Sequence, residues 1–181
     1  RISMVDGSLI IGVTMGDPAG IGPEIGAKLL SARCQDQEIY PVMIGSAEAL
    51  GVALKLIGID AHLNVLSEFD PHNLQPGAIN VYDPGALNIT DVVVGQLDEL
   101  AGEASMLYNR QGAELAMTGQ IHGLVTLPVT KASTKLAGYD YPGQAEYFAK
   151  LAGNLPFTTI LIYRDFRAAL FTTHMPLIEA C

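Results

Sequence analysis

Residues 10–30, IIGVTMGDPAGIGPEIGAKLL, decide the fold of this chain. The stretch opens with Ile10, Ile11 and Val13, a β-branched run that is typical of a buried strand. Pro23 then suits the first turn of a helix, because the N–H group that proline lacks would have no partner there. The stretch therefore predicts a strand, a tight loop and a helix in direct succession.

The loop between them carries Gly16, Gly20 and Gly22, which permit backbone conformations and close approaches that other residues resist. A helix that begins in this way offers free N–H groups to an anion, and Asp17 lies beside it in the sequence. The spacing matches neither GxGxxG nor a Walker loop, since Gly22 is followed by Pro23 instead of lysine. Glycines that serve packing alone explain the pattern equally well.

The composition of the chain disfavours several classes of function. The chain has 181 residues, is 49% hydrophobic and carries a net charge of −9, which disfavours binding to nucleic acid or to an anionic membrane. We see no apolar run of membrane-spanning length and no signal peptide before the first strand. Cys34 and Cys181 fit neither a disulfide nor a metal spacing, so we expect a reducing cytoplasm.

Further along the chain, strand and helix patterns alternate, which predicts an α/β fold with helices layered on the faces of a mostly parallel sheet. The first helix looks amphipathic because Ile21, Ile25 and Leu29 recur at helical spacing. Two closely spaced apolar runs near the end suggest a hairpin, and hence a mixed sheet. The other predicted strands span residues 38–45, 62–66, 78–82, 121–129, 158–163 and 168–173. The other predicted helices span 47–57, with Ser46 as its N-cap, 96–117, whose apolar face includes Tyr108, 133–137 and 145–152.

Three polar residues follow predicted strands, at the edge where α/β sheets bind ligands. Asp17 follows the first strand, Lys131 follows the strand at 121–129, and His174 follows the last one. Lys131 could hold a phosphate or a carboxylate, or be an ordinary solvated lysine. A lone histidine such as His174 is more often structural than a ligand, because a metal site needs three or more protein ligands.

A second glycine-preceded helix start lies in the segment YPGQAEYF, where Gln144 and Ala145 come first and Glu146 completes the turn. This arrangement suits either plain helix capping or a second anion-binding helix terminus. No Ser-His-Asp or Cys-His spacing is recognisable. The residues alone therefore predict an anion-binding α/β domain.

Four segments, in order, resemble the 4-hydroxythreonine-4-phosphate dehydrogenase family of vitamin B6 synthesis. They are GVTMGDPAGIGPEI, VTLPVTKAS, AGYDYPGQAEYFAKLAG and FTTHMPL, and together they extend over nearly the whole chain. The resemblance implies a fold like that of isocitrate and isopropylmalate dehydrogenases, with two α/β/α domains around a cleft in a homodimer. It also implies that residues 1–181 are the amino-terminal portion of such an enzyme, without its carboxyl-terminal portion.

The resemblance assigns roles to particular residues. His174 matches one of three histidines that bind a divalent metal such as Zn, Mg or Co, and Lys131 and Asp17 match positions near the substrate and cofactor cleft. Gln144 and Ala145 stand where the family has a substrate-contacting His-Thr pair. Glutamine cannot become a cation and alanine lacks the hydroxyl, so this departure predicts a changed substrate contact.

The implied reaction is oxidation of a secondary alcohol on a phosphorylated hydroxy acid, such as 4-hydroxythreonine 4-phosphate, with decarboxylation. NAD or NADP would accept the hydride, and the metal would polarise the alcohol oxygen. Two alternatives stay open. One is a related dehydrogenase for a four-carbon sugar-acid phosphate, and the other is a truncated, non-catalytic anion-binding protein.

Overall fold

The computed structural model describes residues 8–36, 38–85, 88–172 and 175–181. The chain divides into two compact units, residues 1–140 and residues 141–181, and each is described by itself. In the described residues no helix is both long enough and apolar enough to cross a membrane.

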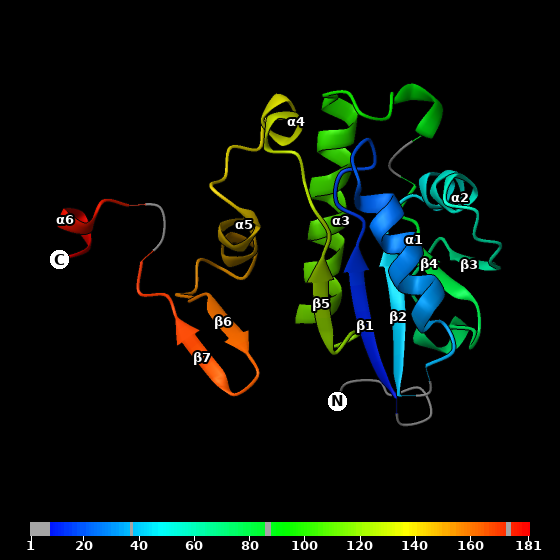
Figure 1. The fold of residues 1–181 in the computed structure, drawn as a ribbon, viewed down its shortest axis with the longest axis horizontal. Helices are drawn as coiled ribbons and strands as arrows, with labels where there is room; N and C mark the ends of the chain where they lie inside the picture. The colour runs from blue at the N-terminus through cyan, green and yellow to red at the C-terminus, as the bar shows by residue number, and fades with distance from the viewer. Residues whose placement is uncertain (1–7, 37, 86–87, 173–174) are drawn as a thin grey trace. The chain divides into compact units, whose positions relative to one another are not determined.

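The first unit is built on a five-stranded sheet in the order β3-β4-β2-β1-β5 (Figure 1). Every pairing in this sheet is parallel. The α/β architecture is therefore confirmed, but the strands that make the fold mixed lie outside this sheet. The strands are β1 (Leu9–Thr14), β2 (Ile39–Ile44), β3 (Leu63–Leu66), β4 (Ile79–Tyr82) and β5 (Gly123–Thr126).

Helices cover the sheet from both sides. Met43 of β2 points toward α1 (Gly22–Arg33), because its Cε atom would lie 2.2 Å from a Cβ atom on Gly26. Thr14 of β1 points the other way and donates a hydrogen bond to Asn109 of α3 (Glu99–Met117) at 2.9 Å. Odd-numbered residues of β1 therefore face α1 and even-numbered ones face α3.

The predicted helix α1 is confirmed, with proline in its first turn, but the expected apolar face is wrong. Ile21, Ile25 and Leu29 are exposed. The buried face consists of small residues and one leucine: Gly22, Pro23, Gly26, Ala27 and Leu30. Small side chains suit this face because the end of the buried Met43 side chain already fills the space beside Gly26.

The core lies between the sheet and these helices. Its members include buried side chains of β1, β2 and β4 together with the inner faces of α1, α2 (Ala47–Leu56) and α3. Ser46 caps α2 as predicted, accepting a hydrogen bond from the backbone N–H of Ala49 at 3.1 Å. Short 3₁₀ helices lie at Pro71–Asn73, between β3 and β4, and at Ile89–Asp91, between β4 and α3.

The boundaries of α3 and α4 differ from the sequence expectation. α3 begins at Glu99, because Asp98 caps it by accepting a hydrogen bond from Ala101 N–H at 3.0 Å. α4 (Lys131–Leu136) begins two residues earlier than predicted. Lys131 is therefore the first residue of a helix and not part of the preceding loop.

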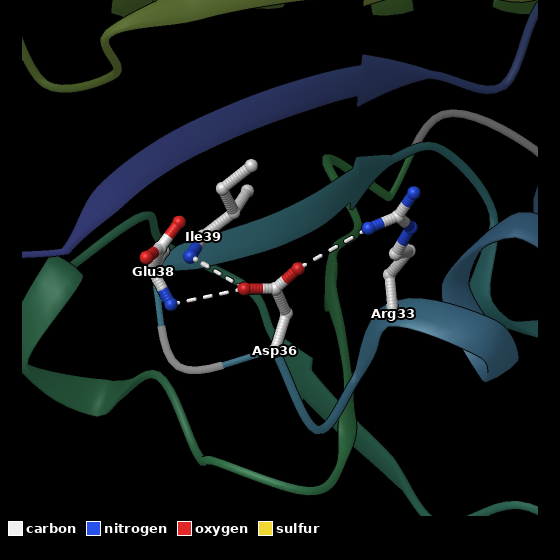
Figure 2. A network of polar contacts seen from close by, with 4 residues as sticks. All are labelled: Arg33, Asp36, Glu38 and Ile39. Atoms are coloured by element: carbon white, nitrogen blue, oxygen red, sulfur yellow. Dashed lines mark hydrogen bonds and ion pairs between the residues drawn. The ribbon is translucent and has the colours of Figure 1, made fainter.

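The connection from α1 to β2 is held by one carboxylate (Figure 2). Asp36 accepts hydrogen bonds from the backbone N–H groups of Glu38 at 2.9 Å and Ile39 at 3.3 Å, and pairs with Arg33 at 3.4 Å. The hydrogen bond from Glu38 is the main cause that holds the pKa of Asp36 below its usual value.

The second unit contains α5 (Gln144–Leu151), the strands β6 (Ile160–Tyr163) and β7 (Phe166–Ala169), and the short helix α6 (Leu177–Ala180). The predicted hairpin is confirmed, because β6 and β7 pair antiparallel as a separate two-stranded sheet. Its second strand was predicted at 168–173 and lies earlier. Arg164 has a φ of 52°, which allows a two-residue turn directly after Tyr163.

Candidate functional site

Asp17 lies directly after β1, in the loop that leads to α1. The residue is 2% exposed, and its carboxylate accepts a hydrogen bond from the N–H of Ala19 at 2.8 Å. Its own N–H donates to the carbonyl of Pro128 at 2.9 Å, which ties this loop to the end of β5. The approach requires Gly16, whose φ is 71° and where a Cβ atom would lie 2.2 Å from the Pro128 oxygen.

Lys131 lies three residues beyond Pro128, at the start of α4. The helix is positioned by α3, where a Cβ atom on Gly102 would lie 2.1 Å from the carbonyl oxygen of Ser133. Ser133 is buried, and its hydroxyl accepts a hydrogen bond from Asp98 N–H at 3.4 Å. The Lys131 side chain is exposed. The fold therefore places an accessible cation at the same sheet edge as the nearly buried Asp17 carboxylate.

The start of α1 is less suited to an anion than the sequence suggested. The Asp17 carboxylate lies against Gly20, because its Cγ atom is 3.5 Å from where a Cβ atom on Gly20 would stand. It already accepts a hydrogen bond from the N–H of Ala19 in the loop. A neighbouring hollow of about 30 Å³ has mostly aliphatic lining residues, and the charged one among those described is Glu24. Negative charge at this position repels a second anion.

Two buried residues of α3 near this edge were not predicted from the sequence to be site residues. Asn109 holds the hydroxyl of Thr14 at the end of β1. Tyr108 is fully buried, and burial is the main cause that raises the pKa of its phenol above the usual range. The helical periodicity identified Tyr108 as a core residue, but no sequence signal marked Asn109.

In the second unit, Gln144 and Ala145 are adjacent in the first turn of α5, as predicted. Gln144 is half-buried and Ala145 is exposed. The Glu146 carboxylate lies against the preceding residue, with one oxygen 2.9 Å from where a Cβ atom on Gly143 would stand. That oxygen is the end of a flexible side chain that can shift, so the contact alone does not require glycine at position 143.

The metal prediction falls on His174, which lies outside the described residues. Among the residues that are described, no group of three His, Cys, Asp or Glu side chains could hold a metal ion. His122 is engaged at the amino ends of the strands, where its Nδ1 atom accepts a hydrogen bond from Ile10 N–H at 3.0 Å. The described side chains thus do not fit a metal centre.

A parallel sheet with helices on both faces, and charged residues at its carboxyl edge, defines a layered α/β protein of the isocitrate dehydrogenase-like class. The model of one family, described as pyridoxal phosphate biosynthetic protein PdxA, matches residues 37–181. The chain belongs to this PdxA family.

Similar proteins include a crystal structure of a 4-hydroxythreonine-4-phosphate dehydrogenase from Burkholderia phymatum, 31% identical with a TM-score of 0.85, matching 95% of this chain and 52% of that one. Two further relatives carry the provisional name D-threonate 4-phosphate dehydrogenase. The protein from Oceanobacillus iheyensis is 33% identical over 94% of this chain and 52% of its own length. The one from Clostridium botulinum Hall is 29% identical over 98% and 53%. The chain therefore spans about half the length of these relatives.

Proposed function

We propose that this chain is the amino-terminal portion of a dehydrogenase that oxidises the secondary alcohol of a phosphorylated hydroxy acid and then decarboxylates the product. The observation that carries the proposal is the PdxA family match over residues 37–181, together with relatives named as dehydrogenases of two phosphorylated four-carbon acids. The substrate class is the feature that these relatives share.

Lys131 and Asp17 are the residues we propose for the reaction. An exposed ammonium at the start of α4 suits a phosphate or carboxylate of the substrate as a point charge. Asp17 is held by Ala19 and by the Pro128 carbonyl, so it presents its carboxylate in one orientation. We propose that it lies beside the reacting alcohol, where its carboxylate accepts the alcohol proton as a general base.

Gln144 and Ala145 are proposed as substrate contacts. The amide of Gln144 can donate one hydrogen bond and accept another, but it cannot supply a positive charge. Ala145 is exposed and adds no polar group. We therefore expect this pair to select for the hydroxyl pattern of the substrate and not for its charge.

NAD or NADP and a divalent metal are proposed as cofactors, and a homodimer in the cytoplasm as the working form, as the family resemblance implies. The described residues do not form a metal cluster, and Asp17 occupies the helix terminus that could have held a pyrophosphate. We therefore derive no step of the reaction through either cofactor. We propose that their main ligands belong to the half of the relatives that this chain does not span.

Isothermal titration of the 181-residue chain with 4-hydroxythreonine 4-phosphate tests the substrate site directly. Lys131→Met should weaken binding about tenfold, the equivalent of about 1.4 kcal/mol, because one ion pair with the ligand is lost. Lys28→Met, an exposed lysine of α1, is the matched control and should bind as the parent chain does. Equal affinities of the two variants would remove Lys131 from the site, and no binding by the parent chain would count against a substrate site in this half.

D-threonate 4-phosphate is the second candidate substrate, favoured by the names of the Oceanobacillus and Clostridium relatives. It carries a hydroxyl where hydroxythreonine carries an amino group. A neutral Gln144 accommodates either group, so direct competition between the two ligands decides which is preferred.

A further inference from the structure

The loop at residues 17–20 orients the Asp17 carboxylate through its own backbone. The N–H of Ala19 donates to a carboxylate oxygen of Asp17 at 2.8 Å. The N–H of Gly20 donates to the backbone carbonyl of Asp17 at 3.0 Å. Because one carboxylate oxygen is bound to Ala19, the direction of the other oxygen depends on where Ala19 lies.

A contact from outside the loop holds Ala19 in place. Its carbonyl oxygen accepts a hydrogen bond from the N–H of Gly95 at 2.7 Å, which is at the short end of the range for such bonds. Gly95 lies in the segment 92–98, which leads from the 3₁₀ helix at Ile89–Asp91 into α3 (Figure 1). This bond therefore ties the β1–α1 loop to a part of the chain that is distant in the sequence.

Apolar packing reinforces the same contact. Ala19, Val92 and Ala101 form a small buried cluster that is separate from the main core. Val92 precedes Gly95 by three residues, and Ala101 lies in the first turn of α3. Ala19 is therefore fixed through its side chain as well as through its carbonyl, and both contacts come from residues 92–101.

The turn that presents the Gly95 N–H favours glycine. Residues 93–96 form a turn closed by a hydrogen bond from the N–H of Gln96 to the carbonyl of Val93 at 3.2 Å. Gly95 is the third residue of this turn and has a φ of 85°, in the left-handed region that a type II turn requires at that position. A Cβ atom on Gly95 would meet nothing within 4 Å, so the backbone conformation disfavours other residues and the surroundings do not.

We infer that Gly95 is a positioning residue for Asp17. Its N–H fixes Ala19, and the N–H of Ala19 fixes the carboxylate. This role rests on the proposed function, in which that carboxylate is the general base. A general base must lie within hydrogen-bond reach of the proton that it accepts, and a displacement of about 1 Å can lower the rate about a hundredfold. Gly95 acts through Ala19 and needs no contact with the substrate.

Substitutions at two glycines test this role. Gly95→Val disfavours the left-handed conformation, because a β-branched side chain resists positive φ. Gly58→Val is the matched control, since Gly58 follows α2, has a φ of 71° and also has nothing within 4 Å of an added Cβ atom. Gly95→Asn is the conservative variant, because asparagine tolerates positive φ.

Amide hydrogen exchange followed by NMR measures the hold on Ala19 in the 181-residue chain. Gly95→Val should speed exchange of the Ala19 amide about tenfold or more, whereas Gly95→Asn and Gly58→Val should leave it unchanged. The two valine variants should show a similar fall in unfolding temperature, because each strains one backbone position. Unchanged exchange at Ala19 in Gly95→Val overturns the inference, whatever the effect on activity.

Turnover shows whether this hold serves the reaction. It is measured in the complete polypeptide, of which we propose this chain to be the amino-terminal portion. With 4-hydroxythreonine 4-phosphate, Gly95→Val should lower kcat about tenfold or more and change KM by less than about twofold. Gly95→Asn should restore most of the rate, and Gly58→Val should retain it. An equal loss of kcat in both valine variants would make the effect one of stability and overturn the inference.

Failure of the proposed function has a different signature. A parent polypeptide that turns over neither 4-hydroxythreonine 4-phosphate nor D-threonate 4-phosphate would refute the reaction. Faster exchange at Ala19 in Gly95→Val would then still support the hold of Gly95 on the Asp17 loop. Normal turnover of Gly95→Val despite faster exchange would retain the reaction and overturn the role of Gly95 in it.

Discussion

The strands of the two units have equally apolar sequences and very different surroundings. In the first unit, Ile10 and Ile44 are 0% exposed between the sheet and its helices. In the second, Ile160 of the β6–β7 hairpin is 52% exposed, and Tyr163 and Phe166 are each 68% exposed. An apolar strand sequence therefore does not by itself show that the strand is buried. In the first unit, described helices cover the central strands, whereas the described residues of the second unit leave its hairpin exposed. A two-stranded hairpin by itself is marginally stable in water.

Truncation of one isoleucine in each region should give the largest contrast. Ile44→Ala should lower the free energy of unfolding by about 3 kcal/mol, because it leaves a cavity in a packed core. Ile162→Ala in the hairpin should lower it by about 0.5 kcal/mol or less, because that side chain is 65% exposed. Urea unfolding followed by circular dichroism measures both. A loss of similar size at Ile162 would show that the hairpin is packed in solution and would break the comparison.

Two helical glycines of the first unit provide a similar comparison between a tightly packed position and an open one. Gly102→Ala should destabilise by about 2 kcal/mol, because the new methyl group would lie 2.1 Å from the Ser133 backbone oxygen and must displace α4. Gly51→Ala in α2 meets nothing within 4 Å and should stabilise by about 0.5–1 kcal/mol through helix propensity.

Thermal unfolding of the two glycine variants checks these opposite signs. Gly102→Ala should also weaken substrate binding more than Gly51→Ala does, since α4 begins at Lys131. Two variants that unfold at the same temperature would mean that α4 is not held by α3.

The sequence predicted the parts of this structure that depend on local chemistry. The βα turn with Pro23, the Ser46 cap and the hairpin all follow from residue types at fixed spacing. The buried face of α1 could not be predicted in this way. Ile21 and Ile25 match the helical period but are exposed, because the buried face packs against the Met43 side chain, which favours glycine at position 26. Such close approaches depend on tertiary packing, which no local pattern encodes.

In the candidate site too, some features follow from local sequence and others depend on tertiary packing. The position of Asp17 and Lys131 at one sheet edge follows from strand order in an α/β fold, and the structure places both there. The role of Asn109 depends on which turn of a long helix meets Thr14, and its sequence neighbours carry no sign of that contact. His174 falls outside the described residues, so its metal role stays a prediction.

Removal of the α3 cap should have an intermediate effect on the first unit. Asp98→Ala should cost about 1 kcal/mol, because it leaves the Ala101 N–H without its 3.0 Å acceptor. Asp140→Ala, which breaks an exposed ion pair with Lys135, is the matched control. It should leave the free energy of unfolding nearly unchanged. Urea unfolding separates them, and equal effects would argue against the capping role.

The smallest effect should come from Asp36, in the connection from α1 to β2. Its pKa in the folded chain lies below the unfolded value of about 3.9, chiefly because the Glu38 N–H stabilises the charged form. A carboxyl with a lowered folded pKa contributes stability above the unfolded pKa, and that contribution is lost as the pH falls through the folded pKa. Asp36→Asn should therefore reduce stability slightly near neutral pH, and the difference from the parent should shrink in acid.

Unfolding in urea at a series of pH values from neutral to strongly acidic measures this difference. Arg33→Gln is the informative companion, because it removes the 3.4 Å ion pair and leaves both backbone hydrogen bonds to Asp36 in place. It should cost less than Asp36→Asn, since the backbone contacts outweigh an exposed ion pair. A deficit for Asp36→Asn that is the same at every pH would mean that the charge of the carboxylate does not stabilise the connection from α1 to β2.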